Sequence, residues 1–230
     1  ADATGIQFRM LNASKGPSVR APRAQCDKKA YQFRMKAILE KSENCDITQA
    51  SVTKFLTRND QIIGVETNYG VQYFADAVVV TTGTFMRGLI HVGKRSQSGG
   101  RMADTVSGIS EGFEALGLKL GRFKTGTPCR LLASSINFSV CERQDGDKEP
   151  AAFSHIRETI TRNIEEVHTL NHFSNGLFHV EQIPCWLTYT NENTHHIIQS
   201  NIHKSPLYSG MIDGVGPRYC PSIEDKVVKF

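Results

Sequence analysis

The sequence predicts an α/β fold, and three consecutive patterns in its first half indicate it. Residues 27–41 have helical periodicity, because their apolar side chains recur on one face. Between residues 47 and 74 the pattern changes to short strands separated by turn residues. Residues 77–82 contain the run Ala-Val-Val-Val, which is typical of a strand buried between two layers. Gly83 follows and allows a sharp change of chain direction.

The strand pattern between residues 47 and 74 is typical of a β-meander. The expected strands are residues 47–57, 61–67 and 71–74. Asn59-Asp60 and Tyr69-Gly70 supply the turns between them, since these residue types tolerate the backbone angles of tight turns. A meander followed by a buried strand that ends at Gly83 resembles part of the FAD-binding domains of the glutathione reductase type. Many other α/β sheets share this pattern, so by itself it leaves the cofactor open.

Beyond residue 100 the pattern predicts a smaller, inserted α+β unit. The expected elements are a helix after Asp104 that ends at Gly117, a helix over residues 155–170, strands near 177–180 and 185–190, and a helix over 192–203. We therefore expect three parts. Residues 1–100 form the part that resembles an FAD-binding domain, residues 101–210 form the inserted α+β unit, and residues 211–230 return toward the first domain.

Composition excludes several classes of protein. A hydrophobic content of 39% over 230 residues can form a core, and no apolar run approaches the length of about 20 residues that a membrane span needs. The six cysteines are spread singly, which favours reduced thiols and a cytoplasmic setting. The net charge of +4 permits contact with nucleic acid without requiring it. His195, His196 and His203 lack the clustering of metal ligands, so no metal site is expected.

Residues 216–230, called the signature segment below, place Cys220 at the expected start of a helix. Pro221 suits a first helical turn, and Ser222 with Asp225 three residues later can form a variant capping box. The positive end of the helix, together with Arg218 and Lys226, favours the thiolate form of the cysteine. The alternative is that Cys220 is an inert, half-buried small residue, as single cysteines often are.

The signature segment resembles the GidA/MnmG family, the flavoproteins that modify the wobble uridine of certain tRNAs, and it agrees over all fifteen positions. Four further blocks point to the same family: residues 5–17, 23–25, 82–85 and 124–128. The resemblance covers nearly the whole chain and is weakest between about residues 134 and 182. It implies that FAD, NADH and methylenetetrahydrofolate, as one-carbon donor, take part in building a carboxymethylaminomethyl group on carbon 5 of the uridine. Glycine or ammonium supplies the amine.

The resemblance makes residues 1–100 part of an FAD-binding domain and residues 101–210 a nucleotide-associated unit, and it also assigns single residues. It makes Cys220 the catalytic thiol that attacks the uridine or activates the intermediate. The residues it implies for cofactor binding are Val52, Gly83, Thr84, Ser107, Gly216, Pro217, Arg218, Tyr219, Pro221, Ser222, Glu224 and Lys226. For Ser107, a plain helix-capping hydroxyl is the alternative. Independently of the resemblance, a basic run with loop character suits either a solvated surface or a phosphate of flavin or tRNA; it consists of Lys15, Arg20, Arg23, Lys28 and Lys29.

Partners and boundaries follow from the same resemblance. The family binds tRNA, works with an MnmE-type GTPase and forms a homodimer, and no membrane contact is expected. Its glycine-rich FAD turn, a second cysteine and its helical tRNA-binding domain have no counterpart in this sequence. The chain is therefore expected to be the central part of a longer enzyme, inactive and nearly free of FAD by itself. The alternatives are a related folate- and FAD-dependent tRNA methyltransferase, or a non-catalytic fragment that binds nucleotide or RNA.

Overall fold

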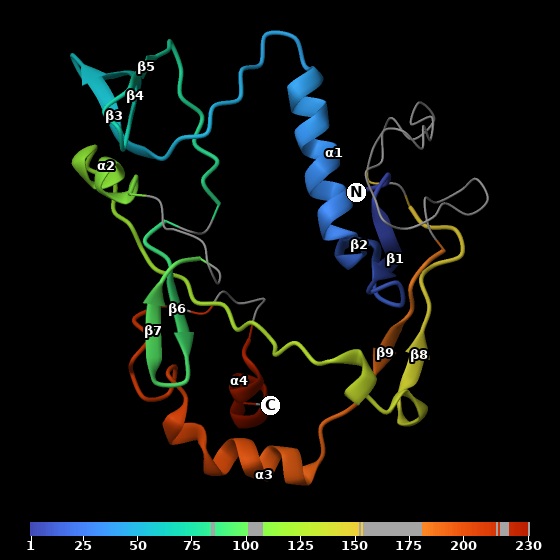
Figure 1. Ribbon diagram of the computed structural model, residues 1–230. Helices are drawn as coiled ribbons and strands as arrows, with labels where there is room; N and C mark the ends of the chain where they lie inside the picture. Colours follow the sequence, from blue (N-terminus) through green and yellow to red (C-terminus); the bar gives the residue numbers. More distant parts are fainter. Residues whose placement is uncertain are drawn as a thin grey trace. The chain divides into compact units, whose positions relative to one another are not determined.

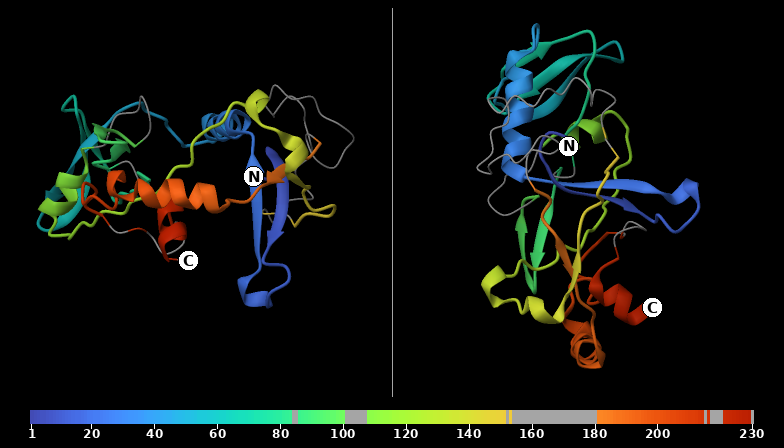
Figure 2. Two further views of the ribbon diagram at one scale, coloured as in Figure 1. Left: turned by 90° about the horizontal axis from the view of Figure 1, so that it is seen from below. Right: turned by 90° about the vertical axis from the view of Figure 1, so that its right-hand side faces the viewer.

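The computed structural model describes residues 1–83, 86–100, 108–151, 153, 181–214, 216 and 221–229 (Figure 1). These residues belong to two compact units. Unit 1 consists of Ala1–Ile47 and Leu131–Tyr189, and unit 2 consists of Thr48–Arg130 and Thr190–Phe230. Figure 2 shows the same elements from two further directions. The sequence analysis divided the chain by function into residues 1–100, 101–210 and 211–230. That division stays a prediction.

Unit 1 is built around a two-stranded antiparallel sheet. β1 (Gly5–Leu11) pairs with β2 (Ala21–Cys26), and a short 3₁₀ helix, η1 (Pro17–Val19), lies between them. The other edge of β1 is also occupied, because the amides of Asp147 and Ile183 donate to the carbonyls of Phe8 and Ile6, each at 2.8 Å. The sequence analysis did not predict β1 or β2.

Among its described residues, the rest of unit 1 consists of one α-helix, a small sheet and two 3₁₀ turns. α1 (Lys28–Lys41) confirms the helix predicted over residues 27–41, and the Asp27 carboxylate caps it by accepting from the amides of Lys29 and Ala30. Ala30 is buried, whereas the larger apolar side chains of α1 are exposed. The remaining elements are η2 (Ala133–Ser135), η3 (Phe138–Val140), and the antiparallel pair β8 (Glu142–Gln144) and β9 (Cys185–Leu187).

The meander of unit 2 confirms the predicted one. β3 (Val52–Arg58), β4 (Gln61–Thr67) and β5 (Gln72–Phe74) form an antiparallel sheet in that order. Asn59, Asp60 and Gly70 have positive φ values of 50°, 62° and 77°, as the turn residues predict. β3 begins five residues later than expected: its register with β4 starts at Val52, and beyond it the carbonyl of Ser51 still accepts from the amide of Asn68 at 2.8 Å.

The strand predicted over residues 77–82 is absent from the structure. These residues have no regular secondary structure, and Val79 is 85% exposed. A strand exists only where another segment completes its hydrogen bonds, and no described segment of the chain pairs with this one. An unpredicted hairpin follows instead, formed by β6 (Leu89–Val92) and β7 (Arg95–Ser98).

Three α-helices and one 3₁₀ helix complete the described part of unit 2. α2 (Ser110–Ala115) packs on the meander through Phe113, whose ring meets that of Phe55 with centroids 5.1 Å apart, and it ends before Gly117 as predicted. α3 (Glu192–Ser200) and η5 (Ile202–Lys204) confirm the helix predicted over residues 192–203. α4 (Ile223–Lys229) lies in the signature segment and contacts α3. The predicted helix at residues 155–170 and strand at 177–180 lie outside the described residues.

Candidate active site

The start of α4 has the capping box that the sequence predicts. The Oγ of Ser222 accepts from the amide of Asp225 at 3.2 Å, and Oδ2 of Asp225 accepts from the amide and the hydroxyl of Ser222 at 3.4 Å and 3.1 Å. Two amides that a helix start would otherwise leave unsatisfied are thereby hydrogen-bonded. The helix begins at Ile223, so Pro221 precedes the cap instead of lying in the first turn.

Asp225 also joins distant parts of unit 2. Besides Ser222, its carboxylate accepts hydrogen bonds from Lys229 at 2.8 Å, Tyr208 at 3.1 Å and Lys124 at 3.4 Å. We call these five residues the Asp225 network. The hydrogen bond from Lys229 lowers the pKa of the Asp225 carboxyl far below its ordinary value; burial opposes this, and Tyr208 and Ser222 add to it. Asp225 is therefore ionised at neutral pH, even though only 8% of it is exposed.

The pKa values of two hydrogen-bond partners of Asp225, Tyr208 and Lys229, are also shifted. Burial, followed by the hydrogen bond to Asp225, raises the pKa of the Tyr208 phenol. The same carboxylate raises the pKa of the Lys229 ammonium through its hydrogen bond. Both groups thus keep the protons that they donate to Asp225 over a wider pH range than in free solution.

Lys124 enters the network from the 124–128 block. Its side chain is only 10% exposed and lies against Gly216, where a Cβ would come within 3.0 Å of Lys124 Cε. Two residues further on, a Cβ at Gly126 would lie 3.5 Å from the Cβ of Ser222. Two of the sequence blocks that carry the family resemblance are thus in direct contact.

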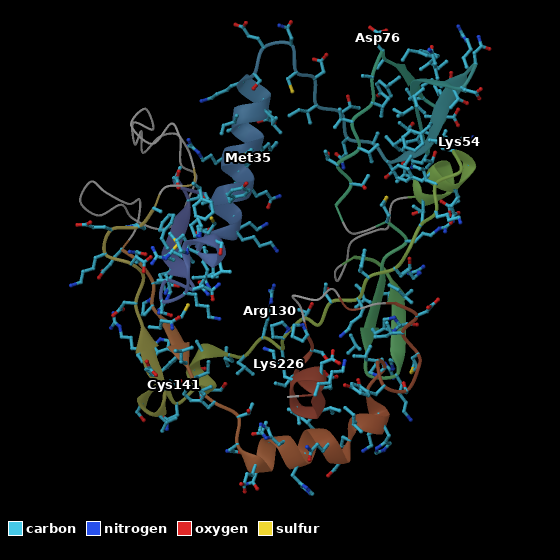
Figure 3. The ribbon with its side chains drawn as sticks, turned by 180° about the vertical axis from the view of Figure 1, so that it is seen from behind. Met35, Lys54, Asp76, Arg130, Cys141 and Lys226 are labelled. Carbon is cyan, nitrogen blue, oxygen red and sulfur yellow. The ribbon has the colours of Figure 1, made fainter. Side chains whose placement is uncertain are left out.

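Two further predicted residues lie on α4. Glu224 accepts from the hydroxyl of Ser205 at 3.0 Å. Burial would raise the pKa of the Glu224 carboxyl, but its own backbone amide, Ser222 and Ser205 together lower it. Lys226 makes no ion pair with any described residue, and its place on α4 is labelled in Figure 3.

The predicted FAD contacts are only partly described. Val52 is the first residue of β3. Gly83 has a φ of 66°, and apart from its chain neighbours no atom of the described residues lies within 4 Å of the place where a Cβ would be. Gly83 therefore presents open backbone, as a close ligand contact requires. No hydrogen bond joins Val52 or Gly83 to α4 within the described part of the chain. The predicted site residues outside the described ranges are Thr84, Ser107, Pro217, Arg218, Tyr219 and Cys220.

Arg87 connects the segment after Gly83 to α2. Its guanidinium donates to Glu111 at 2.9–3.0 Å and to Glu114 at 2.7–2.8 Å, and its carbonyl accepts from Arg122 at 3.1 Å. The pKa of Arg87 is raised by these hydrogen bonds, with that to Glu114 first. Planar, bidentate pairing of this kind fixes orientation as well as distance.

The sequence analysis did not assign Lys124, Ser205, Tyr208 or Lys229 to the site. No local signal could have placed Lys124 there, because its partner Asp225 is 101 positions away in the sequence. Five cysteines, Cys26, Cys45, Cys129, Cys141 and Cys185, are described and free. Across the described ranges, no three His, Cys, Asp or Glu residues are grouped to hold a metal ion, and no helix is long and apolar enough to cross a membrane.

The fold and the site together define an α/β protein whose C-terminal helix start is held by a buried lysine–aspartate pair. Comparison with known families agrees with the sequence resemblance: the family described as glucose inhibited division protein A matches residues 1–230. The chain belongs to this family.

Related proteins agree with this family assignment. The chain is 51% identical to the tRNA uridine 5-carboxymethylaminomethyl modification enzyme MnmG of Geotalea uraniireducens over 230 residues, and 52% identical to that of Protochlamydia amoebophila. Each alignment covers all of this chain and 34% of the relative, so the chain spans about a third of their length. Its structure resembles Aquifex aeolicus GidA in the form I crystal with a TM-score of 0.80 and 48% identity, over 99% of this chain and 36% of that one.

Proposed function

We propose that this chain is the central part of an FAD-dependent enzyme that modifies carbon 5 of the tRNA wobble uridine. The observation that carries the proposal is the Asp225 network, which joins the 124–128 block to the capped start of α4 in a chain about half identical to MnmG enzymes.

The central chemical step is assigned to Cys220. Its thiolate adds to carbon 6 of the uracil ring, and the electron pair of the carbon 5–carbon 6 double bond makes carbon 5 nucleophilic. Carbon 5 then bonds to the methylene carbon of methylenetetrahydrofolate, and the bond from that carbon to one folate nitrogen breaks. The amine of glycine or ammonia takes the place of the second folate nitrogen on the same carbon and loses a proton, so that tetrahydrofolate leaves. Loss of the proton on carbon 5 finally expels the sulfur and restores the double bond. The thiol at a helix start suits this role, because the helix dipole favours its ionised form.

The chain's own residues are assigned to two cofactors, FAD and the nicotinamide nucleotide. Val52, Gly83, Thr84 and Ser107 hold FAD, and the open backbone at Gly83 fits that contact. When bound, the flavin supplies redox chemistry with electrons from NADH. Residues of the signature segment hold the nicotinamide nucleotide; they are Gly216, Pro217, Arg218, Tyr219, Pro221, Ser222, Glu224 and Lys226. We further expect a homodimer, an MnmE-type GTPase partner and a cytoplasmic setting for this enzyme.

Product analysis tests the proposed function. An intact enzyme that carries this sequence is incubated with tRNA lacking the wobble modification, together with FAD, NADH, methylenetetrahydrofolate, glycine, the GTPase partner and GTP. Mass spectrometry of the nucleosides should detect 5-carboxymethylaminomethyluridine, or the aminomethyl form when ammonium replaces glycine. Cys220→Ser should remove the product and Cys45→Ser should not, because Cys45 is exposed and far from the signature segment in sequence. Formation of 5-methyluridine would favour the methyltransferase alternative, and an active Cys220→Ser enzyme would contradict the assignment.

A further inference from the structure

The net positive charge of the chain lies in one hairpin of unit 1. β1 and β2, with the loop between them, span residues 5–26 (Figure 1), and we call this stretch the cationic hairpin. It contains four Lys and Arg side chains and no Asp or Glu, whereas the rest of the chain contains 23 cationic and 23 anionic side chains. The net charge of +4 is therefore a local property of this hairpin. Its four cations are Arg9, Lys15, Arg20 and Arg23.

Two of these cations lie directly opposite each other. Arg9 and Arg23 are register partners in the antiparallel pair, so their side chains share one face of the sheet. Like charges in this position destabilise a sheet. Neither arginine forms an ion pair with a carboxylate of the described residues. The carboxylate of Asp145 pairs with Arg143 at 2.8 Å, and Arg9 receives only the carbonyl of Asp145, at 3.4 Å.

Neutral groups hold Arg23 as well. Its guanidinium donates to Oε1 of Gln7 at 3.1 Å, and Gln7 is almost completely buried. The Nε of Arg23 is also buried and has no acceptor within the described chain. Both guanidinium groups are thus held in place by uncharged acceptors, which leaves their positive charges without compensation.

The loop of the hairpin has a defined conformation. The side-chain amide of Asn12 donates to the carbonyl of Val19 at 3.0 Å and closes the loop. The amide of Lys15 donates to the carbonyl of Asn12 at 2.9 Å, and the amide of Arg20 donates to that of Pro17 at 3.2 Å. All residues of the loop are exposed. Lys15 and Arg20 are therefore presented to solvent on an ordered turn.

The four cations form a row along the hairpin, and a row fits a repeated anion. Strands rise about 3.3 Å per residue, so the backbone positions of Arg20 and Arg23 are about 10 Å apart. A polynucleotide offers a phosphate at every nucleotide, and arginine and lysine are the usual partners of these phosphates. The pyrophosphate of FAD is a single short anion that backbone amides at a helix start ordinarily hold. The row of cations therefore favours RNA over the flavin.

We propose that the cationic hairpin binds the sugar–phosphate backbone of the tRNA substrate through Arg9, Lys15, Arg20 and Arg23. This inference rests on the proposed function, because that function supplies the RNA. Binding tRNA compensates the charges that the fold leaves unpaired. Contacts of this kind add affinity and orientation without reading the base sequence.

The test compares variants of the intact enzyme. Lys15→Gln and Arg20→Gln, singly and together, each remove one exposed charge. Arg9→Gln removes a charge from the strand, and Arg20→Lys keeps the charge of the loop. Lys36→Gln is the matched control, because Lys36 is an exposed cation of the same unit that pairs with Glu40. Fluorescence anisotropy measures the Kd for unmodified tRNA over a series of salt concentrations, and flavin absorbance measures bound FAD.

The expected result is a loss of affinity that depends on salt. Lys15→Gln and Arg20→Gln should each raise the Kd for tRNA by about fivefold at 0.1 M salt and lower the slope of log Kd against log salt by about 1. The two effects should add in the double variant. Arg20→Lys should restore most of the affinity. FAD content and kcat at saturating tRNA should stay within twofold of wild type, and Lys36→Gln should leave Kd and slope unchanged.

Two outcomes would overturn the proposal. If the double variant has the Kd and salt slope of the Lys36→Gln control, the hairpin is a solvated surface. If it instead loses FAD while the salt slope stays at the wild-type value, the phosphate that it binds belongs to the flavin. Should Arg9→Gln not fold, the exposed loop variants decide. Failure of the proposed function looks different, because then tRNA binds with the hairpin-dependent slope but no modified uridine forms.

Discussion

The ammonium nitrogen of Lys124 lies 3.4 Å from Oδ2 of Asp225, although the two residues are 101 positions apart in the sequence. This contact makes the signature segment depend on a block that precedes it by about a hundred residues. The structure of the helix start is therefore a property of unit 2 as a whole, and substitutions in either block should affect the other. The predictions below use this dependence.

The cap of α4 gives the first prediction. Ser222→Ala removes the hydroxyl that accepts from the Asp225 amide and donates to its carboxylate. Loss of a serine cap costs about 1 kcal/mol, so the amides of α4 should exchange with deuterium several-fold faster. Ser209→Ala is the control, since its hydroxyl has only a long 3.4 Å bond to the carbonyl of Pro206. Equal exchange in the two variants would show that the cap contributes nothing measurable.

The low pKa of Asp225 gives a prediction about acid stability. A carboxyl whose pKa is lower in the folded state contributes stability above its unfolded pKa, about 3.9, and loses it as the pH falls toward the folded value. The difference in urea midpoint between wild type and Asp225→Asn should thus be constant from pH 7 to 5. It should shrink below about pH 4. Asp76→Asn, at an exposed position, should show no such difference at any pH.

The space around Gly216 and Gly126 gives a matched pair of substitutions. A Cβ at Gly216 would lie 3.0 Å from Lys124 Cε, which is tighter than ordinary contact, whereas a Cβ at Gly126 would meet Ser222 at an ordinary 3.5 Å. Gly216→Ala should destabilise the protein by about 1 kcal/mol through overpacking, and Gly126→Ala by less than about 0.5 kcal/mol. Urea unfolding measures both. A larger effect at Gly126 would contradict the described packing.

The sequence predicted the parts of the fold that depend on local chemistry. α1 follows from the Asp27 cap and helical periodicity, the meander from its turn residues, and the start of α4 from the spacing of Ser222 and Asp225. Residues 77–82 were predicted as a strand because their composition is that of one. Composition, however, supplies no hydrogen-bonding partner.

The parts that could not be predicted depend on contacts between distant segments. β1 alternates Ile6, Phe8 and Met10, but its partner β2 contains Pro22 and Arg23, which obscure the strand pattern. Lys124 has no feature in its own neighbourhood that distinguishes it from a surface lysine. Only the fold brings it to the buried carboxylate of Asp225.

Arg87 gives a prediction about the proposed flavin site. Its guanidinium pairs with Glu111 and Glu114 and so ties the residues after Gly83 to α2, which follows Ser107 in the sequence. Arg87→Lys keeps the charge but loses the forked geometry, so the intact enzyme should retain FAD less tightly. Arg143→Lys is the control, because Arg143 pairs with Asp145 in unit 1. Flavin absorbance after gel filtration measures retention, and equal retention in both variants would remove Arg87 from this role.

The last prediction is that Cys220 is the most reactive of the six thiols. Cys26, Cys141 and Cys185 are half-buried, and Cys185 donates to Gln7 at 3.3 Å, so Cys45 and Cys129 are the exposed competitors. A helix start beside cations can lower a thiol pKa from about 8.5 into the range of roughly 3.5–7.5, which raises the thiolate fraction at neutral pH by about tenfold or more. Limiting iodoacetamide near pH 7, followed by peptide mapping of the intact enzyme, ranks all six. Exposure alone would instead label Cys45 and Cys129 first, and that order would leave the capped helix of the signature segment with a structural role only.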